Sequence, residues 1–133
     1  MQGEEHLPTE REWRIMEAVW DSADRPTSAE ILSRIDENAY LDARTARVLL
    51  HHLCKKGLLG YTVDPRDSRV YHYYALRTRE ECLREKTRRF TDAYFRGSGS
   101  GAAAAFLRNA DFTDEQLRAL EAILAERKEA DDP

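Results

Sequence analysis

Two Thr-x-x-Glu motifs near the start of the chain constrain its fold more than any other feature. Thr9 with Glu12, and Thr27 with Glu30, have the spacing of a capping box, in which the two side chains bind free backbone N–H groups at a helix start. Each motif is followed by apolar residues at helical spacing. We therefore predict two short amphipathic helices in the first 35 residues. Their apolar stripes are Trp13, Met16, Val19 and Trp20 in the first helix and Ile31, Leu32 and Ile35 in the second.

A third helix is predicted between Asp42, a favourable N-cap residue, and Gly57, which can adopt the left-handed conformation that ends a helix. Its two sides differ in chemistry. Cations that recur every three or four residues project from one side of a helix, and such a helix can lie in the major groove of DNA. The inward side is expected to carry Ala46, Leu49, Leu50 and Leu53, and the outward side Arg44, Arg47, His51 and Lys55.

A β-hairpin is predicted directly after this helix. Residues 58–63 and 69–76 are rich in β-forming residues, and residues 64–68 have the composition of a turn. Three helices followed by a hairpin is the order of a winged helix-turn-helix domain, which we place at residues 7–76. The expected fold class is mainly α with a small β-hairpin wing, followed by a helical dimerisation domain at residues 77–128.

The C-terminal part of the chain is predicted to be helical. We expect a long helix over residues 78–95, a break at residues 97–101, a short helix over residues 102–108 and a last helix that begins after Thr113. Three helices in about 50 residues bury little apolar surface alone. Their apolar residues form either a core within one chain or, as we favour, the interface with a second copy. This set is Phe90, Tyr94, Phe95, Phe106, Leu117, Leu120, Ile123 and Leu124.

The distribution of charge is more informative than its total. The chain of 133 residues has a formal net charge of −4, which argues against a uniformly basic nucleic-acid-binding protein. Residues 1–41 carry a net −6 and residues 97–133 a net −4, whereas residues 42–76 and 77–96 each carry +3. The basic middle is either an ordinary solvated surface or a stripe that faces a polyanion.

The sequence contains no pattern typical of a secreted, membrane or catalytic protein. It shows no apolar signal region and no run of about 18 apolar residues, so we expect a cytosolic protein without membrane insertion. No Ser/His/Asp set, phosphate loop or carboxylate pair indicates an enzyme, and no cofactor is expected. His51 and Cys54 could share a helix face, but a structural zinc site needs four ligands, so no metal site is predicted. We expect Trp13 and Trp20 to be core residues.

Four segments give the sequence a family resemblance. The order L-P-T-E-R-E-W-R-I-M-E-A-V-W, T-S-A-E-I-L, R-T-A-R-V-L-L-H-H-L-C-K-K-G-L-L and R-V-Y-H-Y resembles the penicillinase-repressor (methicillin-resistance repressor) family of bacterial winged-helix transcription repressors. The resemblance extends over residues 7–128. It implies a homodimer that binds a pseudo-palindromic operator in double-stranded DNA, with the third helix in the major groove and the C-terminal helices forming the dimer.

A few positions depart from the family pattern. Val48 and His52 stand where relatives often carry Thr and Arg. In the antibiotic-resistance members, a membrane-bound sensor protease triggers cleavage of an Asn-Phe bond in the dimerisation part. The matching residues here are Ala105 and Phe106, which are the candidates for a regulatory cleavage site. The C-x-C pairs of copper-responsive relatives are absent after Cys82.

The expected function is therefore that of a DNA-binding repressor and not of an enzyme. The alternative is a winged-helix module for protein–protein interaction, because a fold does not fix a function. Such a module would more often have apolar residues on the outer side of the third helix. In a repressor, the N-terminal part of that helix reaches base edges, and residues further along contact phosphates. The candidates are Arg44, Thr45 and Arg47 for bases, His51 and Lys55 for phosphates, and Arg66 and Arg69 of the wing for the flanking backbone.

Overall fold

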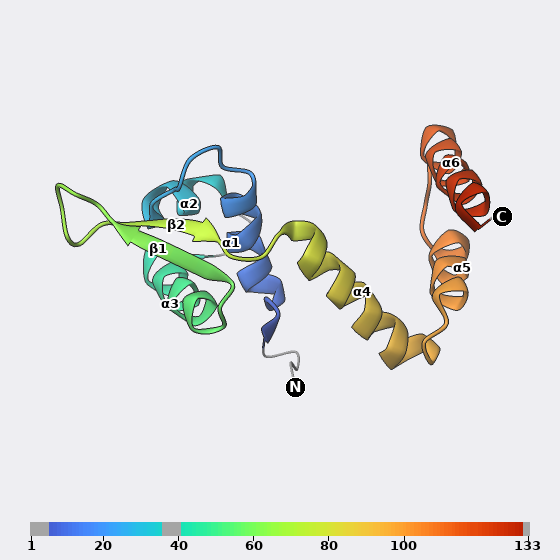
Figure 1. The fold of residues 1–133 in the computed structure, drawn as a ribbon, viewed down its shortest axis with the longest axis horizontal. Coiled ribbons are helices and arrows are strands. Elements are labelled where there is room, and N and C mark those ends of the chain that lie inside the picture. The colour runs from blue at the N-terminus through green and yellow to red at the C-terminus, as the bar shows by residue number, and fades with distance from the viewer. Residues whose placement is uncertain (1–5, 36–40, 132–133) are drawn as a thin grey trace. The chain divides into compact units, whose positions relative to one another are not determined.

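The computed structural model of the chain describes residues 6–35 and 41–131 (Figure 1). The chain divides into two compact units, one up to Arg88 and one from Arg89 onward. Three helices and then a hairpin occur in the first unit, which confirms the predicted fold class, mainly α with a small β-hairpin wing. The elements are α1 (Glu10–Trp20), α2 (Ser28–Arg34), α3 (Ala43–Lys55), β1 (Leu59–Val63), β2 (Tyr71–Ala75), α4 (Arg79–Phe95), α5 (Gly99–Asn109) and α6 (Asp114–Asp131).

Side-chain caps start the first two helices. The Thr9 N–H donates to Glu12 Oε1 at 2.9 Å and the Glu12 N–H donates to Thr9 Oγ1 at 3.2 Å, which completes the capping box at α1. The same pair of hydrogen bonds joins Thr27 and Glu30 at α2. Both capping-box predictions are therefore confirmed. A cap satisfies N–H groups that have no partner inside the helix, so these short motifs fix where the helices begin.

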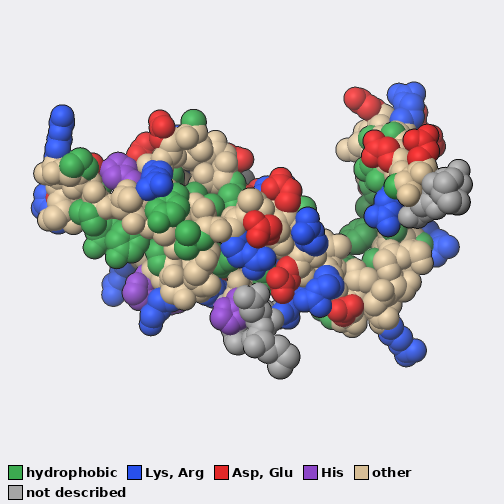
Figure 2. All heavy atoms as spheres, in the orientation of Figure 1, with side chains coloured by type: hydrophobic (Ala, Val, Ile, Leu, Met, Phe, Trp, Pro, Cys, Tyr) green, Lys and Arg blue, Asp and Glu red, His purple; other side chains and the backbone are tan. Residues whose placement is uncertain are grey.

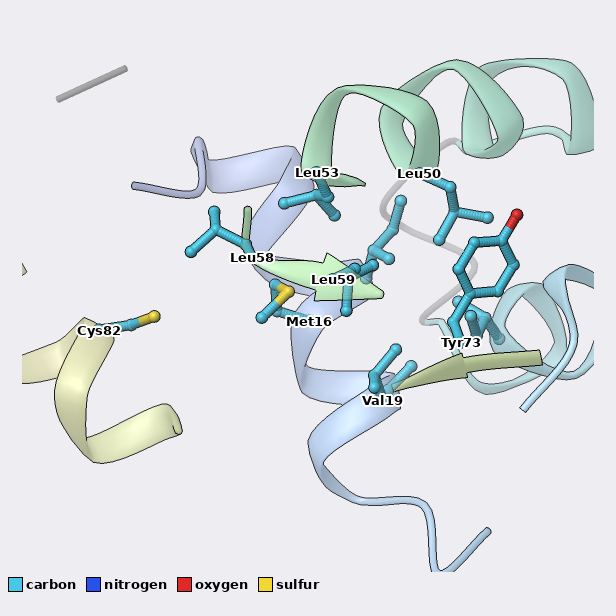
Figure 3. Close-up of a cluster of buried hydrophobic side chains, with 11 residues drawn as sticks. Met16, Val19, Leu50, Leu53, Leu58, Leu59, Tyr73 and Cys82 are labelled. Carbon is cyan, nitrogen blue, oxygen red and sulfur yellow. The ribbon is translucent and has the colours of Figure 1, made fainter. Parts of the chain in front are cut away.

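The first unit has one buried core, to which each element from α1 to α4 contributes (Figure 3). Leu50 and Leu53 project from α3 into it and are fully buried, as the inward side of that helix predicted. Cys82, in the first turn of α4, is also fully buried in this cluster. The cluster is Ile15, Met16, Ala18, Val19, Ile31, Leu50, Leu53, Leu58, Leu59, Tyr73 and Cys82.

Trp13 and Trp20 border this core and are only partly buried. Their rings meet edge to face with centroids 5.2 Å apart, a favourable geometry for an aromatic pair. The Trp20 Nε1–H donates to the backbone carbonyl of Arg77 at 2.9 Å. The two tryptophans were expected to be core residues; they pack on the edge of the core, where the indole N–H of Trp20 reaches a polar partner.

A tight connection places the hairpin directly after α3. Gly57 has φ of 77°, in the left-handed region that glycine adopts without steric cost. The Leu58 N–H then donates to the Leu53 carbonyl at 3.0 Å. From there β1 pairs with β2 in antiparallel register, with Leu59 opposite Ala75. The hairpin therefore follows α3 after a short connection.

The start of α5 differs from the prediction. A break was expected over residues 97–101, but α5 already begins at Gly99, and the chain turns at Arg96 and Gly97, whose φ angles are 52° and 81°. Ser98 is the N-cap, and its Oγ accepts a hydrogen bond from the Gly101 N–H at 3.0 Å. This cap offsets the low helix propensity of glycine, about 1 kcal/mol for each residue relative to alanine.

A buried ion pair joins α1 to the end of α3. The Glu12 side chain is 3% exposed, and Lys56 Nζ lies 2.5 Å from its Oε1 atom. Lys56 also donates to the backbone carbonyl of Leu7 at 3.2 Å. Because Glu12 belongs to the capping box of α1 and Lys56 is the C-cap residue of α3, the pair fixes the end of one helix against the start of the other.

Replacing Lys56 by methionine should lower the free energy of unfolding by about 2 kcal/mol, because it leaves the Glu12 carboxylate buried without its counter-charge. Denaturant unfolding of the full-length chain measures this loss. Lys55→Met is the matched control, since Lys55 is the neighbouring lysine and is exposed. The ion pair has no structural role if the two variants are equally stable.

Candidate nucleic-acid interface

The outward side of α3 is a cationic surface. Figure 2 shows Lys, Arg and His side chains along this helix, and its solvent-facing residues include the four predicted from the spacing. Thr45 is half-buried at the N-terminal end. α3 contains no Asp or Glu from Ala43 to Lys55. The exposed residues on the outward side of α3 are Arg44, Arg47, Val48, His51, His52 and Lys55.

Asp42 fixes the start of this surface. Its Oδ1 accepts a hydrogen bond from the Thr45 N–H at 2.7 Å, which confirms Asp42 as the N-cap. This hydrogen bond is the main reason that the pKa of Asp42 lies below its ordinary value. The carboxylate is thus ionised next to Arg44. The Thr45 backbone N–H is occupied, so only the Thr45 side chain is left for a contact with DNA.

A groove of about 710 Å³ lies between the start of α2, the outward side of α3 and the hairpin. It brings together Arg47 and His51 from α3 and Arg69 from the wing, three of the residues selected from the sequence. The other four candidates, Arg44, Thr45, Lys55 and Arg66, do not line it. The remaining lining residues are Thr27, Ser28, Ala29, Leu50, Cys54, Tyr61, Val70, Tyr71 and Tyr73.

An aromatic pair forms the hairpin side of this groove. The rings of Tyr61 and Tyr71 are stacked with centroids 4.5 Å apart, and both side chains are exposed. Tyr73 lies beside them, 6.3 Å from Tyr61, and is buried. These strands were predicted from their β-forming residues, and none of the three tyrosines was assigned to the site from the sequence. The strand register of the hairpin could have identified these tyrosines. Tyr61 pairs with Tyr73 across the two strands, and Tyr71 lies on the same face of β2 as Tyr73.

In the wing, the side chain of Arg69 is held by the carboxylate of Asp67. Arg69 donates from Nε to Asp67 Oδ1 at 3.0 Å and from Nη2 to Asp67 Oδ2 at 3.1 Å, a two-pronged contact between exposed side chains. The pKa of Asp67 is lowered, chiefly by this contact. Arg66 is exposed in the same turn, and its backbone N–H donates to Asp64 Oδ1 at 2.8 Å. Both wing arginines therefore lie beside carboxylates.

His72 connects the hairpin to the loop before α2. Its Nε2 atom is 2.8 Å from Asp64 Oδ2, and its Nδ1 atom is 3.1 Å from the carbonyl oxygen of Arg25. The Asp64 carboxylate, and then the Arg25 carbonyl, raise the pKa of His72 above its ordinary value of 6.5. Both contacts can be hydrogen bonds at once only when both ring nitrogens carry a proton. His72 was not assigned this role from the sequence, because Asp64 and Arg25 become its neighbours only in the folded domain.

The stability that His72 contributes should depend on pH. Because its pKa is raised in the folded chain, the contribution is complete below about pH 6.5 and is lost as the pH rises through the higher folded value. Asp64, whose pKa is lowered mainly by His72, stays ionised throughout this range. Hydrogen exchange of hairpin amides between about pH 5.5 and 8.5 measures the effect.

The comparison for this experiment is between two histidine variants. His72→Gln should remove the extra hairpin protection found on the acid side, while His51→Gln, on the outward side of α3, should retain it. An identical pH profile in wild type and His72→Gln would contradict the assignment.

The second unit exposes most of its apolar residues. Phe90 is at the centre of an aromatic cluster, with ring centroids 5.2 Å from Tyr94 and 5.8 Å from both Phe95 and Phe106. No side chain of α6 from residue 114 to 130 is buried. Within the predicted dimerisation set, six side chains are exposed and Phe95 and Leu120 are half-buried. The exposed six are Phe90, Tyr94, Phe106, Leu117, Ile123 and Leu124.

The candidate cleavage residues lie inside a helix. Ala105 and Phe106 belong to α5, and the Asn109 side chain donates from Nδ2 to the Ala105 carbonyl at 2.8 Å. Phe106 is exposed. Proteolysis is favoured where the backbone is not held in regular hydrogen bonding, so a protease that cleaves this bond must first unwind the helix.

Two further features concern metals and membranes. In residues 6–35 and 41–131 there is no group of three or more His, Cys, Asp or Glu side chains placed to bind a metal ion. No helix within the same ranges is both long and apolar enough to cross a membrane.

A comparison with known protein families agrees with the winged helix-turn-helix fold described above. The sequence model of the penicillinase repressor family matches residues 8–126. The chain belongs to this family. The resemblance found in the sequence is therefore confirmed. A penicillinase repressor from Bacillus licheniformis is 22% identical over 120 residues, which is 90% of this chain and 91% of that protein.

Solved structures of bacterial regulators are also similar to this family member. The crystal structure of MarR is 18% identical, with a TM-score of 0.49 over 92% of this chain and 77% of that chain. The MepR–DNA complex of S. aureus is 16% identical, with a TM-score of 0.46 over 81% of this chain and 84% of that chain.

Proposed function

We propose that the chain is a homodimeric transcriptional repressor that binds a pseudo-palindromic operator through α3 and the wing. The observation that carries this proposal is the chemistry of α3, which buries Leu50 and Leu53 on one side and, from Ala43 to Lys55, carries basic residues and no Asp or Glu of its own. A surface that docks a protein partner would more often be apolar at its centre. The membership in a family of repressors supports the same function.

The recognition of DNA divides between base edges and phosphates. Arg44 and Arg47, in the first half of α3, can each bind guanine O6 and N7 with two hydrogen bonds, and Thr45 can contact a phosphate or a thymine methyl. His51 and Lys55, one and two turns beyond Arg47, would contact phosphates. The groove beside Arg47, with Tyr61 and Tyr71 on its hairpin side, offers apolar and hydrogen-bonding groups to the sugar-phosphate backbone. Arg66 and Arg69 of the wing would contact the flanking backbone.

The second unit supplies the proposed dimer contact. The exposed apolar residues of α4, α5 and α6 are the surface that a second copy would cover. A two-fold dimer places two α3 helices on half-sites about one helical turn of DNA apart, or a multiple of it. Relief of repression by cleavage between Ala105 and Phe106 would act through this contact, because it would separate α6 from the rest of the chain.

The dependence of binding on salt tests this function. With about six phosphate contacts per dimer, the log–log slope of affinity against salt should be about −5, or an affinity loss of about 1,000-fold between 50 and 200 mM salt. A gel-shift titration with duplexes selected by the protein from a random library measures it. If no duplex is retarded even at the lower salt concentration, the proposed function is wrong.

A further inference from the structure

One apolar side chain interrupts the cationic outward side of α3. Val48 is 48% exposed, and it lies one helical turn after Arg44 and directly after Arg47. His51 follows it by three residues. All three of these neighbours are exposed. Val48 therefore lies within the surface that the proposed function presents to the major groove.

Neither the core nor the helix accounts for a valine at this position. The buried side of α3 is made by Ala46, Leu50 and Leu53, and Val48 is not part of the core cluster. β-branched residues also have lower helix propensity than alanine, because the preceding turn restricts their side-chain rotation. Val48 thus lies outside the core and keeps about half of its surface free for a contact in a complex.

The chemistry around Val48 specifies the group that it would meet. Its neighbours Arg44, Arg47 and His51 suit a polyanion that also offers hydrogen-bond acceptors. Among the base pairs of DNA, only those with thymine present a methyl group in the major groove. Valine has one strongly preferred side-chain rotamer in a helix, so its two methyl groups are held in place before binding.

We propose that Val48 contacts the C5-methyl group of a thymine in each half-site and thereby selects thymine at that position. This inference rests on the proposed function and deepens it, because it assigns one base preference to one side chain. The same contact favours DNA over RNA of equal sequence, since uracil lacks the methyl group.

The experiment removes the methyl group from either side of the contact. A duplex selected by the wild-type protein is remade with deoxyuridine in place of each thymidine in turn, and affinity is measured by fluorescence anisotropy. One thymidine per half-site should lose about fourfold in affinity on this exchange, as expected for one buried methyl group. With the Val48→Ala variant, the exchange at that position should change affinity by less than about 1.5-fold.

Val63→Ala is the matched control. Val63 is also 48% exposed, but it lies at the end of β1 and outside α3. This variant should keep the fourfold penalty for deoxyuridine at the same position. If no thymidine shows a penalty, or if Val48→Ala shows the same penalty as wild type, the assignment to Val48 is overturned while DNA binding itself stands. If the wild-type protein selects no duplex at all, the proposed function and this inference both fail.

Discussion

Replacing both Arg44 and Arg47 by alanine should weaken operator binding by about 1,000-fold. Each two-pronged contact of an arginine with guanine is worth about 1–3 kcal/mol, and a dimer loses four such side chains. A loss of about 1,000-fold corresponds to about 4 kcal/mol, which is at the low end of that sum. Both residues are exposed, so the fold should remain intact in the variant. Fluorescence anisotropy with a selected duplex at constant salt measures the change.

A pair of arginines with the same spacing provides the control for charge. Arg11 and Arg14 of α1 are also three residues apart on a helix and are exposed. The Arg11→Ala, Arg14→Ala double variant changes the net charge by the same amount and should bind within about threefold of wild type. Equal losses in the two double variants would mean that α3 does not read bases and that binding depends on total charge alone.

Replacing Ile123 by aspartate should convert the dimer to monomers and weaken operator binding by at least about 100-fold. Ile123 is 53% exposed within one chain, so the substitution should leave the monomer folded. In a two-fold interface, however, each substitution occurs twice, and each places an unpaired carboxylate in an apolar contact. A monomer also loses the gain that comes from binding two linked half-sites, which is about 100- to 10,000-fold. Sedimentation velocity and anisotropy measure the two effects separately.

Ala122→Asp is the matched control for the dimer. Ala122 is exposed and lies on the opposite side of α6 from the stripe that contains Ile123. Alanine to aspartate costs the helix more than isoleucine to aspartate does, so a loss of helicity alone would affect this variant at least as much. It should remain a dimer. A dimer that persists in Ile123→Asp would show that α6 is not the interface.

The parts of the fold that the sequence predicts well are those controlled by neighbours within four residues. The Thr9 and Thr27 caps and the Asp42 cap are local hydrogen bonds, and each begins a helix where its motif predicts. The predicted start of α5 was wrong. The Ser98 cap favours a helix and the low helix propensity of Gly99 and Gly101 opposes it, and composition alone does not show which of the two effects is larger.

The parts that the sequence does not show depend on residues far apart in the chain. Glu12 and Lys56 are 44 positions apart, and nothing in either motif indicates that they meet. His72 likewise lies 47 positions from Arg25. For the candidate site, the periodicity of α3 was sufficient to find its outward side. The groove that gathers Arg47, His51 and Arg69 required the folded hairpin.

The contact between Asp67 and Arg69 has a consequence for how selective the proposed complex would be. A carboxylate that already occupies the guanidinium group acts as an internal competitor of phosphate, so Arg69 exchanges one anion for another when DNA arrives. The net gain from this wing contact is then small for every duplex, whatever its sequence. Arg69 would therefore add little general attraction to DNA, and the difference between an operator and any other duplex would depend more on the side chains that reach the bases.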